Sequence, residues 1–482
     1  MFGPSRQIRQ RLKTLEGHLK HENPLLVSAV HSYRQLDQVG YSLGLLGPEE
    51  SFTMQIPWWP LVSVLGTFSA GKSTFINHYL AYPLQKTGTQ AVDDRFTVIC
   101  YSRDQSAHEL PGVALDADPR FPFYQFSEEL EKVAEGEGRR VDSYLQLKTC
   151  PTEQLRGMIL IDSPGFDADD QRTGTLRIID HIIDLSDLVL VFFDARHPEP
   201  GAMRDTLKHL VGDTVSRPDA SKFLYVLNQI DVTAREDNPE EVVASWQRAL
   251  ATEGLTAGRF YTTYSPEAAV AIEDDETRRR FEEKRDKDLI EIHRRIHEVG
   301  IERAYRIVGT LENTARHIEE EAVPQLRALI GQWERRVLWW DLGFYLLLAA
   351  ALVGGSVWAG WWQGLKFAPP WWDSFLASRP SQIGAGVALL AVLVALHFVS
   401  RRIVASQLLR KLRRSLDPGP WRERLMRAFR HNTRPWRSIF SPEPAGWHWF
   451  TRKRLNKVYL DSDRYVQSLN DRFTDPSGET RQ

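Results

Sequence analysis

The feature that most constrains the fold is the stretch from Gly66 to Ser73, which reads Gly-Thr-Phe-Ser-Ala-Gly-Lys-Ser. It fits the pattern G-x-x-x-x-G-K-[ST] of a phosphate-binding loop, whose backbone N–H groups surround phosphate oxygens. An apolar run of strand type, residues 60–65, precedes it, and residues 73–80 favour a helix because they contain neither Pro nor Gly. Strand, glycine loop and helix in this order direct the helix N-terminus towards the phosphates.

The loop assigns candidate ligands for the phosphates of a nucleotide. Lys72 is predicted to reach the outer phosphates, and the hydroxyl of Ser73 is predicted to hold Mg²⁺. The predicted phosphate-binding residues are Gly66, Phe68, Ser69, Ala70, Gly71, Lys72, Ser73 and Thr74, with Gly165 further along the chain.

The region from 56 to 265 has the alternation of strand and helix that is typical of an α/β domain. Apolar runs of strand character lie at residues 96–100, 144–148, 157–161, 187–194 and 222–227. Helix-compatible sequence lies between the later runs, which predicts a mainly parallel sheet with helices on both faces. The expected fold class is therefore an α/β P-loop domain, followed by a helical stalk and a two-helix transmembrane hairpin.

Two of these strands end in polar motifs. Residues 157–161 lead into Asp162-Ser163-Pro164-Gly165, where the aspartate is predicted to organise Mg²⁺ and the glycine N–H to meet the terminal phosphate. Residues 222–227 lead into Asn228 and Asp231 at the carboxyl end of a strand, where such sheets bind ligands. A carboxylate there can accept from the N1–H and the exocyclic amine of guanine, so both residues are predicted to bind the base.

These motifs together resemble the dynamin superfamily of GTPases, and more closely its branch of Eps15-homology-domain ATPases and bacterial dynamin-like proteins. The resemblance rests on residues 66–77, 161–166 and 190–196. It implies nucleotide hydrolysis, self-assembly into a homo-oligomer through the nucleotide domain, and work on membranes, with the bacterial inner membrane as the location. A serine at the position of Ser69 stabilises charge between the phosphates in this family, so Ser69 joins Lys72 as a predicted catalytic residue.

Three departures from the family pattern bear on the chemistry. Phe68 stands where some members carry glutamine, which removes one polar group near the attacking water. Gln229 stands where the base motif often carries lysine, so GTP is predicted with ATP as the alternative. The family's switch I places two threonines before an aspartate, but Val92 and Asp93 occupy those positions here. Either Thr89 or Thr97 takes the catalytic role, or Asp93 does, or hydrolysis is slow.

Helical sequence flanks the nucleotide region. Residues 5–46 predict two helices separated at Pro24, and the charged region after 268 carries apolar residues in steps of three and four. This apolar seam, of coiled-coil type, is predicted to be interrupted by Pro324. Its members are Val308, Leu311, Ala315, Ile318 and Ala322.

Two uncharged runs follow, at residues 342–362 and 383–400. A bilayer core needs about 20 apolar helical residues, so the first run is long enough and the second is near the short limit. Tryptophans flank the runs, and positive charges at both outer ends predict a two-pass hairpin with both termini cytoplasmic and residues 363–382 outside. The alternatives are a buried helical hairpin in a soluble tip, or a paddle that enters only one leaflet.

The formal charge of −2 conceals an asymmetry. Residues 401–457 contain sixteen Lys or Arg and three acidic residues, a net charge of +13, so the remainder of the chain sums to −15. A basic, Trp-containing segment directly after a membrane span predicts binding to anionic lipid headgroups. Nucleic acid is the competing acidic partner, but no nucleic-acid-binding motif is visible.

The sequence thus predicts five consecutive segments with distinct roles. They are an N-terminal helical arm (1–55), a P-loop GTPase domain (56–265), a helical stalk (266–337), a transmembrane hairpin (338–400) and a basic C-terminal segment with a tail (401–482). The predicted function is that of an integral-membrane, dynamin-like GTPase that drives membrane remodelling, fusion or tethering. The alternatives are a membrane-tethered nucleotide switch that recruits partners with slow turnover, and a scaffold that no longer hydrolyses nucleotide.

Overall fold

The structure is a computed structural model that describes residues 3–88, 95–121, 141–165, 181–197, 220–235, 239–252, 255 and 258–473. The chain divides into two compact units, each assembled from separate stretches of sequence. The nucleotide unit comprises Arg9–His31, Thr53–Gly309 and Arg464–Gln482, and the hairpin unit comprises Met1–Ile8, Ser32–Phe52 and Thr310–Asp463.

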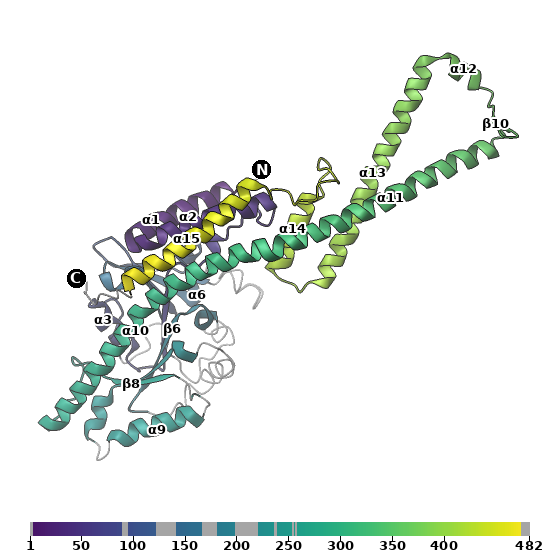
Figure 1. Ribbon diagram of the computed structural model, residues 1–482. Coiled ribbons are helices and arrows are strands. Elements are labelled where there is room, and N and C mark those ends of the chain that lie inside the picture. Colours follow the sequence, from purple (N-terminus) through teal and green to yellow (C-terminus); the bar gives the residue numbers. More distant parts are fainter. Residues whose placement is uncertain are drawn as a thin grey trace. The chain divides into compact units, whose positions relative to one another are not determined.

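The nucleotide unit contains an eight-stranded sheet in the order β3-β4-β2-β5-β1-β6-β7-β8 (Figure 1). The pairs β5–β1, β1–β6, β6–β7, β7–β8 and β2–β4 are parallel, while β2–β5 and β3–β4 are antiparallel. The sheet is therefore mainly parallel, as predicted. Its strands are β1 (Leu61–Gly66), β2 (Phe96–Tyr101), β3 (His108–Pro111), β4 (Leu145–Cys150), β5 (Ile159–Asp162), β6 (Leu188–Asp194), β7 (Phe223–Asn228) and β8 (Arg259–Thr263).

Helices cover both faces of this sheet. On one face, α3 and α10 pack on alternate residues of the central strands, because Phe75 and Ile292 belong to the same buried apolar cluster as Val62. On the other face, the Trp246 ring of α9 lies edge-on against Phe193, with ring centroids 5.5 Å apart. The helices that start in the arm or lie in this unit are α1 (Arg6–Glu22), α2 (Pro24–Leu43), α3 (Lys72–Leu80), α4 (Val113–Ala117), α6 (Val141–Tyr144), α9 (Pro239–Thr252) and α10 (Asp275–Arg316), with short 3-10 turns at Thr53–Gln55, Glu153–Leu155, Ala220–Lys222 and Ile230–Arg235.

Most strands begin or end one residue from the predicted bounds, β5 and β4 differ by two residues at one end, and β3 and β8 were not predicted. β5 begins at Ile159 rather than at residue 157, because Gly157 adopts a left-handed φ of 81° and makes a turn before the strand. β4 runs on to Cys150, beyond the predicted end at residue 148. Cys100 and Cys150 are both buried and form no disulfide with each other.

A buried carboxylate attaches α10 to the sheet. Asp187 precedes β6, and its Oδ2 atom accepts from the backbone N–H of Leu61 at 2.9 Å and from Arg303 Nη2 at 2.5 Å. Its Oδ1 atom lies 2.5 Å from Arg306 Nη2. Burial lowers the pKa of Arg303, and the charge of Asp187 opposes that shift. One side chain therefore joins the starts of β1 and β6 to the helix.

Replacing the two arginines separately should have unequal effects. The side chain of Arg303 is 11% exposed, whereas that of Arg306 is 51% exposed. Arg303→Leu breaks a buried pair, so we expect it to lower the free energy of unfolding by about 3–5 kcal/mol. Arg306→Leu removes an exposed partner of the same carboxylate and should cost at most about 1 kcal/mol. Denaturant unfolding of both variants checks this, and equal losses would contradict it.

The hairpin unit consists mainly of long helices. They are the C-terminal part of α10, a six-residue π-helix (His317–Ala322), α11 (Val323–Trp358), α12 (Trp372–Ala377), α13 (Arg379–Ser415), α14 (Pro420–Asn432) and the part of α15 (Trp449–Phe473) up to Asp463, with the two-residue strands β9 (Trp362–Gln363) and β10 (Lys366–Phe367). α11 and α13 lie side by side near α14 and separate towards α12 (Figure 1).

The helix does not end at Pro324, in contrast to the predicted interruption. It continues from Asp275 to Trp358 over 84 residues and widens into a π turn just before the proline. Proline lacks an N–H and its ring would collide with the carbonyl four residues earlier in an α-helix, so a wider turn relieves that contact.

The same π turn keeps the apolar seam on one face. The buried positions from Val308 to Ala322 alternate in steps of four or three residues, but three successive steps of four occur from Ile318 to Ile330. That pattern is one residue longer than a regular heptad repeat, and a π turn holds the additional residue. The buried positions beyond it are Leu326, Ile330, Trp333 and Val337.

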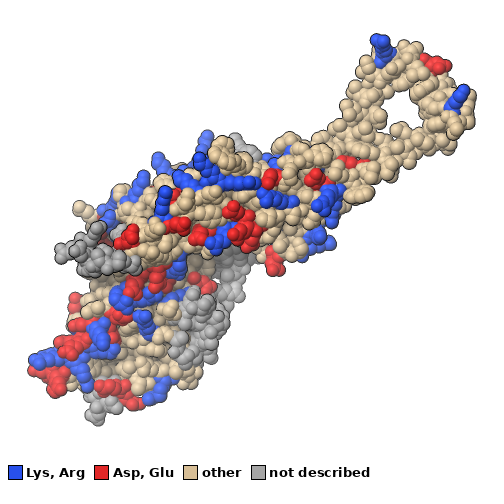
Figure 2. All heavy atoms as spheres, viewed as in Figure 1, with Lys and Arg blue, Asp and Glu red and all other residues tan. Residues whose placement is uncertain are grey.

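The two candidate membrane helices are apolar but not buried in protein. Only 11% of the apolar window in Asp275–Trp358 and 6% of that in Arg379–Ser415 is buried. Figure 2 shows a hairpin surface with almost no charge, and between residues 342 and 400 the charged side chains are Lys366, Asp373 and Arg379. By length and composition, both helices can cross a membrane.

A polar cluster joins the two helices where the first apolar run begins and the second one ends. His397 Nδ1 lies 2.7 Å from a carboxylate oxygen of Asp341, and the hydroxyl of Ser400 donates to the other oxygen. At the opposite end of the hairpin, aromatic rings gather around Phe367, which lies 5.0 Å from Trp372 between ring centroids. The hairpin thus has a polar base and an aromatic tip.

A histidine of α14 should make the hairpin unit sensitive to acid. Burial lowers the pKa of His431 to about 4, with the charges of Arg434 and Arg437 adding to the effect. The ring packs against Gly44, whose φ of 75° and missing Cβ allow the approach. The unfolded chain therefore binds a proton between pH 6.5 and 4 that the folded chain does not, and stability falls as the pH falls through this window.

We expect His431→Gln to remove this contribution. The stability of the variant relative to the unchanged protein should increase as the pH is lowered from 6.5 to about 4, by up to about 1–3 kcal/mol. The same change at His108, whose side chain is 48% exposed, is the control for the loss of a histidine. Unfolding midpoints at a series of pH values measure the difference, and a constant offset would contradict the prediction.

Candidate functional site

The predicted site residues converge at one edge of the sheet. β5, β1, β6 and β7 are parallel neighbours in that order, so their carboxyl ends lie together. Asp162, Gly66 and Asn228 end three of these strands. The phosphate loop, the Asp-x-x-Gly motif and the predicted base motif are therefore adjacent, as expected for a ligand site of a parallel sheet.

The phosphate loop closes tightly over the end of β1. Lys72, the first residue of α3, donates from Nζ to the carbonyl oxygens of Gly66 and Thr67, both at 3.0 Å. Ser69 and Gly71 adopt left-handed φ values of 58° and 85°. A non-glycine residue with such a value is uncommon and is often found at binding sites, where the surroundings hold it in place.

The two glycines of the motif are required by their neighbours. A Cβ atom on Gly66 would lie 2.5 Å from the carbonyl oxygen of Phe192, and one on Gly71 would lie 2.2 Å from Nδ2 of Asn228. Both distances are shorter than a real Cβ contact allows. The backbone of the loop can therefore approach the strands, and a ligand, only without side chains at these positions.

Lys72 is buried at the start of the helix. Burial lowers its pKa to about 8, while the carboxylate of Asp162 opposes the shift. An ammonium group in such a position gains from the arrival of phosphate charge, because burial has already removed most of its water. The remaining loop residues Ser73 and Thr74 lie in the first turn of α3 and are partly exposed.

Asn228 and Gln229 brace the loop from the end of β7. Asn228 Nδ2 donates to the carbonyl of Ala70 at 2.7 Å, and Gln229 Nε2 donates to the carbonyl of Ser69 at 2.6 Å. Gln229 has a left-handed φ of 63°, which turns its amide towards the loop. The residue that replaces the family's lysine therefore has a contact of its own with the phosphate loop.

Asp162 is held by a chain of buried polar groups. Gln85 Nε2 donates to Asp162 Oδ2 at 2.6 Å, and Lys148 Nζ donates to Gln85 Oε1 at 2.7 Å. Asn77 of α3 fixes the segment that carries Gln85, since its side chain accepts from the N–H of Gln85 at 2.8 Å and donates to the carbonyl of the same residue. The segment before β2, β4 and the end of β5 are thus connected through one carboxylate.

Of the switch I candidates, the described residues include Thr97. It lies opposite Asp162 in the antiparallel pair β2–β5, is 1% exposed, and accepts from Gln146 Nε2 at 2.6 Å. Asp93 and Thr89 lie outside the described residues. Thr97 is therefore near the predicted metal ligand but inside the sheet.

The other predicted residues lie around the loop. Gly165 approaches it so closely that a Cβ there would lie 2.9 Å from the Cα of Phe68. Asp231 is buried, its Oδ2 atom accepts from the N–H of Val270 at 2.7 Å, and burial raises its pKa. One carboxylate oxygen of Asp231 is thus engaged with the protein backbone.

The donor set fits a magnesium ion. The hydroxyl of Ser73 and the carboxylate of Asp162 provide hard oxygen ligands, and Mg²⁺ usually takes one or two carboxylates together with water and substrate phosphates. Among the described residues, no group of three or more His, Cys, Asp or Glu side chains forms a separate metal site. In a magnesium site of this kind, the phosphate oxygens of the bound nucleotide provide the remaining ligands together with water.

Sequence reasoning missed Gln85, Lys148 and the bracing role of Gln229. Gln85 follows a short helix in a segment that reads as an ordinary loop, and the alternation of β4 gives no indication that Lys148 is buried. Their contacts span 63 to 160 residues of sequence, so no local pattern could indicate them.

The parallel sheet, the glycine loop and the Asp-x-x-Gly strand define a P-loop nucleotide-binding domain of the GTPase type. Residues 62–230 match the sequence profile of the dynamin family. The nucleotide domain of this chain therefore belongs to the dynamin superfamily, as the sequence resemblance indicated.

Curated relatives match over this domain alone. EH domain-containing protein 1 of Arabidopsis thaliana is 29% identical over 181 residues, which is 36% of this chain and 30% of that protein. The human protein of the same name is 24% identical over 179 residues, 36% of this chain and 31% of its own length. The matches thus span about three tenths of the length of these relatives.

Solved structures also align with the chain. A structure described as an oligomerised bacterial dynamin pair, providing "a mechanism for the long range sensing and tethering of membranes", covers 96% of this chain and 76% of its own, with 13% identity and a TM-score of 0.33.

The buried chain at Asp162 should contribute to the stability of the nucleotide domain. Gln85→Leu removes the amide that joins Asp162 to Lys148, so we expect the free energy of unfolding to fall by about 1–3 kcal/mol. Gln10→Leu changes an exposed glutamine of α1 and is the matched control. Denaturant unfolding of the nucleotide-free protein measures both, and an equally small effect of the two changes would contradict the prediction.

Proposed function

We propose that this protein is a membrane-anchored, dynamin-like GTPase that couples nucleotide hydrolysis to membrane remodelling, fusion or tethering. The observation that carries the proposal is one continuous helix, Asp275–Trp358. It packs Ile292, Ile296 and Val299 into the core beside the phosphate-loop strand, and its other end is a candidate membrane span. A nucleotide site and a membrane hairpin on one helix are suited to mechanical coupling.

The proposed chemistry is attack of water on the γ-phosphate. Lys72 and the loop N–H groups stabilise the transferred charge, and Ser69 acts between the phosphates. Ser73 and Asp162 hold Mg²⁺, which supplies charge neutralisation at the phosphate oxygens when bound. Asn228 and Asp231 bind the base, with GTP as the proposed nucleotide and ATP as the alternative.

The membrane assignment is supported by exposure as well as composition. The apolar helices of a soluble core are mostly buried, whereas those of the hairpin are almost entirely exposed. The aromatic cluster at the tip, and Trp339 and Trp340 just before the first apolar run, suit the two interfaces of a bilayer. We propose a two-pass topology with both termini cytoplasmic, in a bacterial inner membrane, with anionic lipids and further copies of the chain as partners.

A slow switch is the second candidate function. Thr97 is enclosed in the sheet and already engaged with Gln146, which favours tight nucleotide binding with slow hydrolysis unless Asp93 or Thr89 positions the water. The division into the five segments predicted from the sequence, from the arm at 1–55 to the basic segment at 401–482, belongs to the same proposal.

Turnover of GTP and ATP by the full-length protein tests this function. The protein is reconstituted in vesicles of phosphatidylcholine alone or mixed with phosphatidylglycerol. We expect GTP hydrolysis that the anionic lipid stimulates and that Lys72→Ala reduces by roughly 10²–10³-fold, because it removes a group that stabilises the transition state. Lys20→Ala, an exposed lysine of α1, is the control and should retain activity.

The outcomes separate the candidates. Tight GTP binding without turnover in either vesicle would favour the switch, and a preference for ATP would overturn the base assignment. Turnover that Lys72→Ala leaves unchanged would contradict the proposed chemistry.

A further inference from the structure

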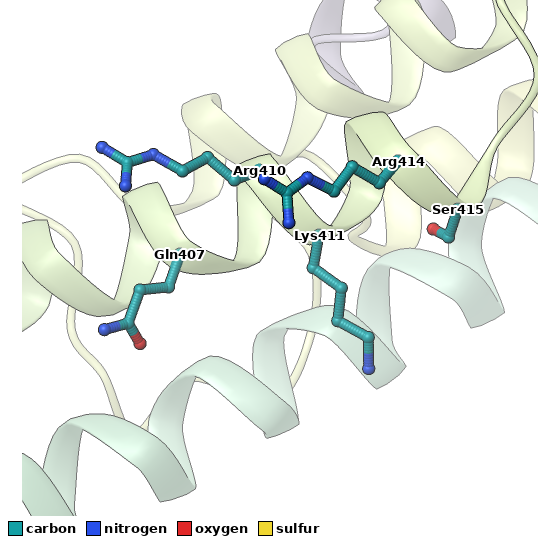
Figure 3. A pocket seen from close by; sticks show the side chains of 5 residues that line it. All are labelled: Gln407, Arg410, Lys411, Arg414 and Ser415. Carbon is teal, nitrogen blue, oxygen red and sulfur yellow. The ribbon is translucent and has the colours of Figure 1, made fainter.

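A basic pocket lies on α13, the helix that continues from the second candidate span. It has a volume of about 480 Å³ and is lined by Gln407, Arg410, Lys411, Arg414 and Ser415 (Figure 3). We propose that this basic pocket binds a phosphate group, and that its occupant is the headgroup of an anionic phospholipid. The proposal rests on the membrane-anchored function above and assigns one specific site for its lipid partner.

The charges of the pocket are not compensated within the described part of the chain. Arg410, Lys411 and Arg414 form no ion pair or side-chain hydrogen bond with any described residue. Other arginines of the hairpin unit do have acidic partners, since Arg327 and Arg452 both contact Glu443. Three like charges in one hollow repel each other, so an external anion is the group that relieves the repulsion.

The pocket residues lie on the exposed side of α13. Val404, Leu408 and Leu412 are buried and fix one face of the helix in the protein. Figure 3 shows Arg410 and Arg414 extending in the same direction along the helix, towards Gln407. This is the N-terminal direction in which helical side chains normally tilt, and on α13 it leads towards the apolar run.

The distance from the membrane selects a headgroup rather than an acyl chain. Arg410 follows Ser400, the last residue of the apolar run, by ten positions, which corresponds to roughly 15 Å along the helix. The headgroup layer extends about 5–8 Å beyond the hydrocarbon core, and the helix tilt and the direction of the guanidinium groups shorten the remaining gap. The pocket thus faces the polar side of the headgroup layer.

The residue types suit a phosphate. Arginine presents a planar fork that can bind two phosphate oxygens at once, and lysine adds a compact positive charge. Gln407 supplies a neutral hydrogen-bond donor at one end of the row, whereas the hydroxyl of Ser415 at the other end donates to the carbonyl of Leu412. A basic pocket beside a membrane helix on the cytoplasmic side is a recognised arrangement for anionic headgroups.

Calorimetric titration of the full-length protein in detergent micelles tests the site. The protein carries Lys72→Ala and no nucleotide, so that the phosphate loop competes less for phosphate and the result does not depend on hydrolysis. The ligands are short-chain phosphatidylglycerol, short-chain phosphatidylcholine and inorganic pyrophosphate. We expect phosphatidylglycerol to bind and the combined change Arg410→Gln, Lys411→Gln and Arg414→Gln to weaken it by roughly 10- to 100-fold.

A charge-matched variant separates the pocket from the general positive charge. Arg413→Gln, Arg454→Gln and Lys457→Gln remove three exposed cations that do not line the pocket. Equal weakening by both triple variants, or none by either, would overturn the proposal. Binding of pyrophosphate but not of phosphatidylglycerol, with the same dependence on the pocket, would retain the phosphate site and overturn the lipid as its occupant. Unchanged thermal unfolding of both variants excludes misfolding as the cause.

Discussion

The contact on which the nucleotide unit most depends is the buried ion pair of Asp187. The carboxylate accepts from the first residue of β1 and from Arg303 of α10, so it connects the strand that leads into the phosphate loop with the long helix. A shift of the helix near Arg303 therefore acts on the opposite end of the strand from Gly66. Because a buried charge is costly without its partner, the pair resists partial displacement and favours movement of strand and helix together.

Asp162 is a second buried carboxylate of the nucleotide unit. Its carboxylate accepts from Gln85, which lies before β2, and Gln85 in turn accepts from Lys148 of β4. Asn77 of α3 holds the same segment through two contacts with the backbone of Gln85. One amide thus connects the chain before β2, the end of β5 and β4.

Local patterns predicted the parts of the molecule that local chemistry determines. The glycine loop, the apolar strands around it and the uncharged hairpin each follow from short stretches of sequence, and the structure has them where they were expected. Lys148 and Arg303 were not predictable in the same way, because a charged residue in a strand or on a charged helix reads as solvent-facing. Their burial depends on partners far away in the sequence, Gln85 and Asp187. The π turn could not be predicted either, since a proline in a helical sequence indicates only that the helix is interrupted.

The π turn at His317–Ala322 also has a consequence for the hairpin. A π turn takes up one additional residue without turning the helix beyond it, so the seam positions before and after it keep one face. A chain shortened by one residue there would continue as a regular α-helix and would present the same side of α11 to α13. A residue removed from an α-helical part would instead turn that side by about 100°, so the orientation of the hairpin is encoded in a count of residues and not in their chemical character.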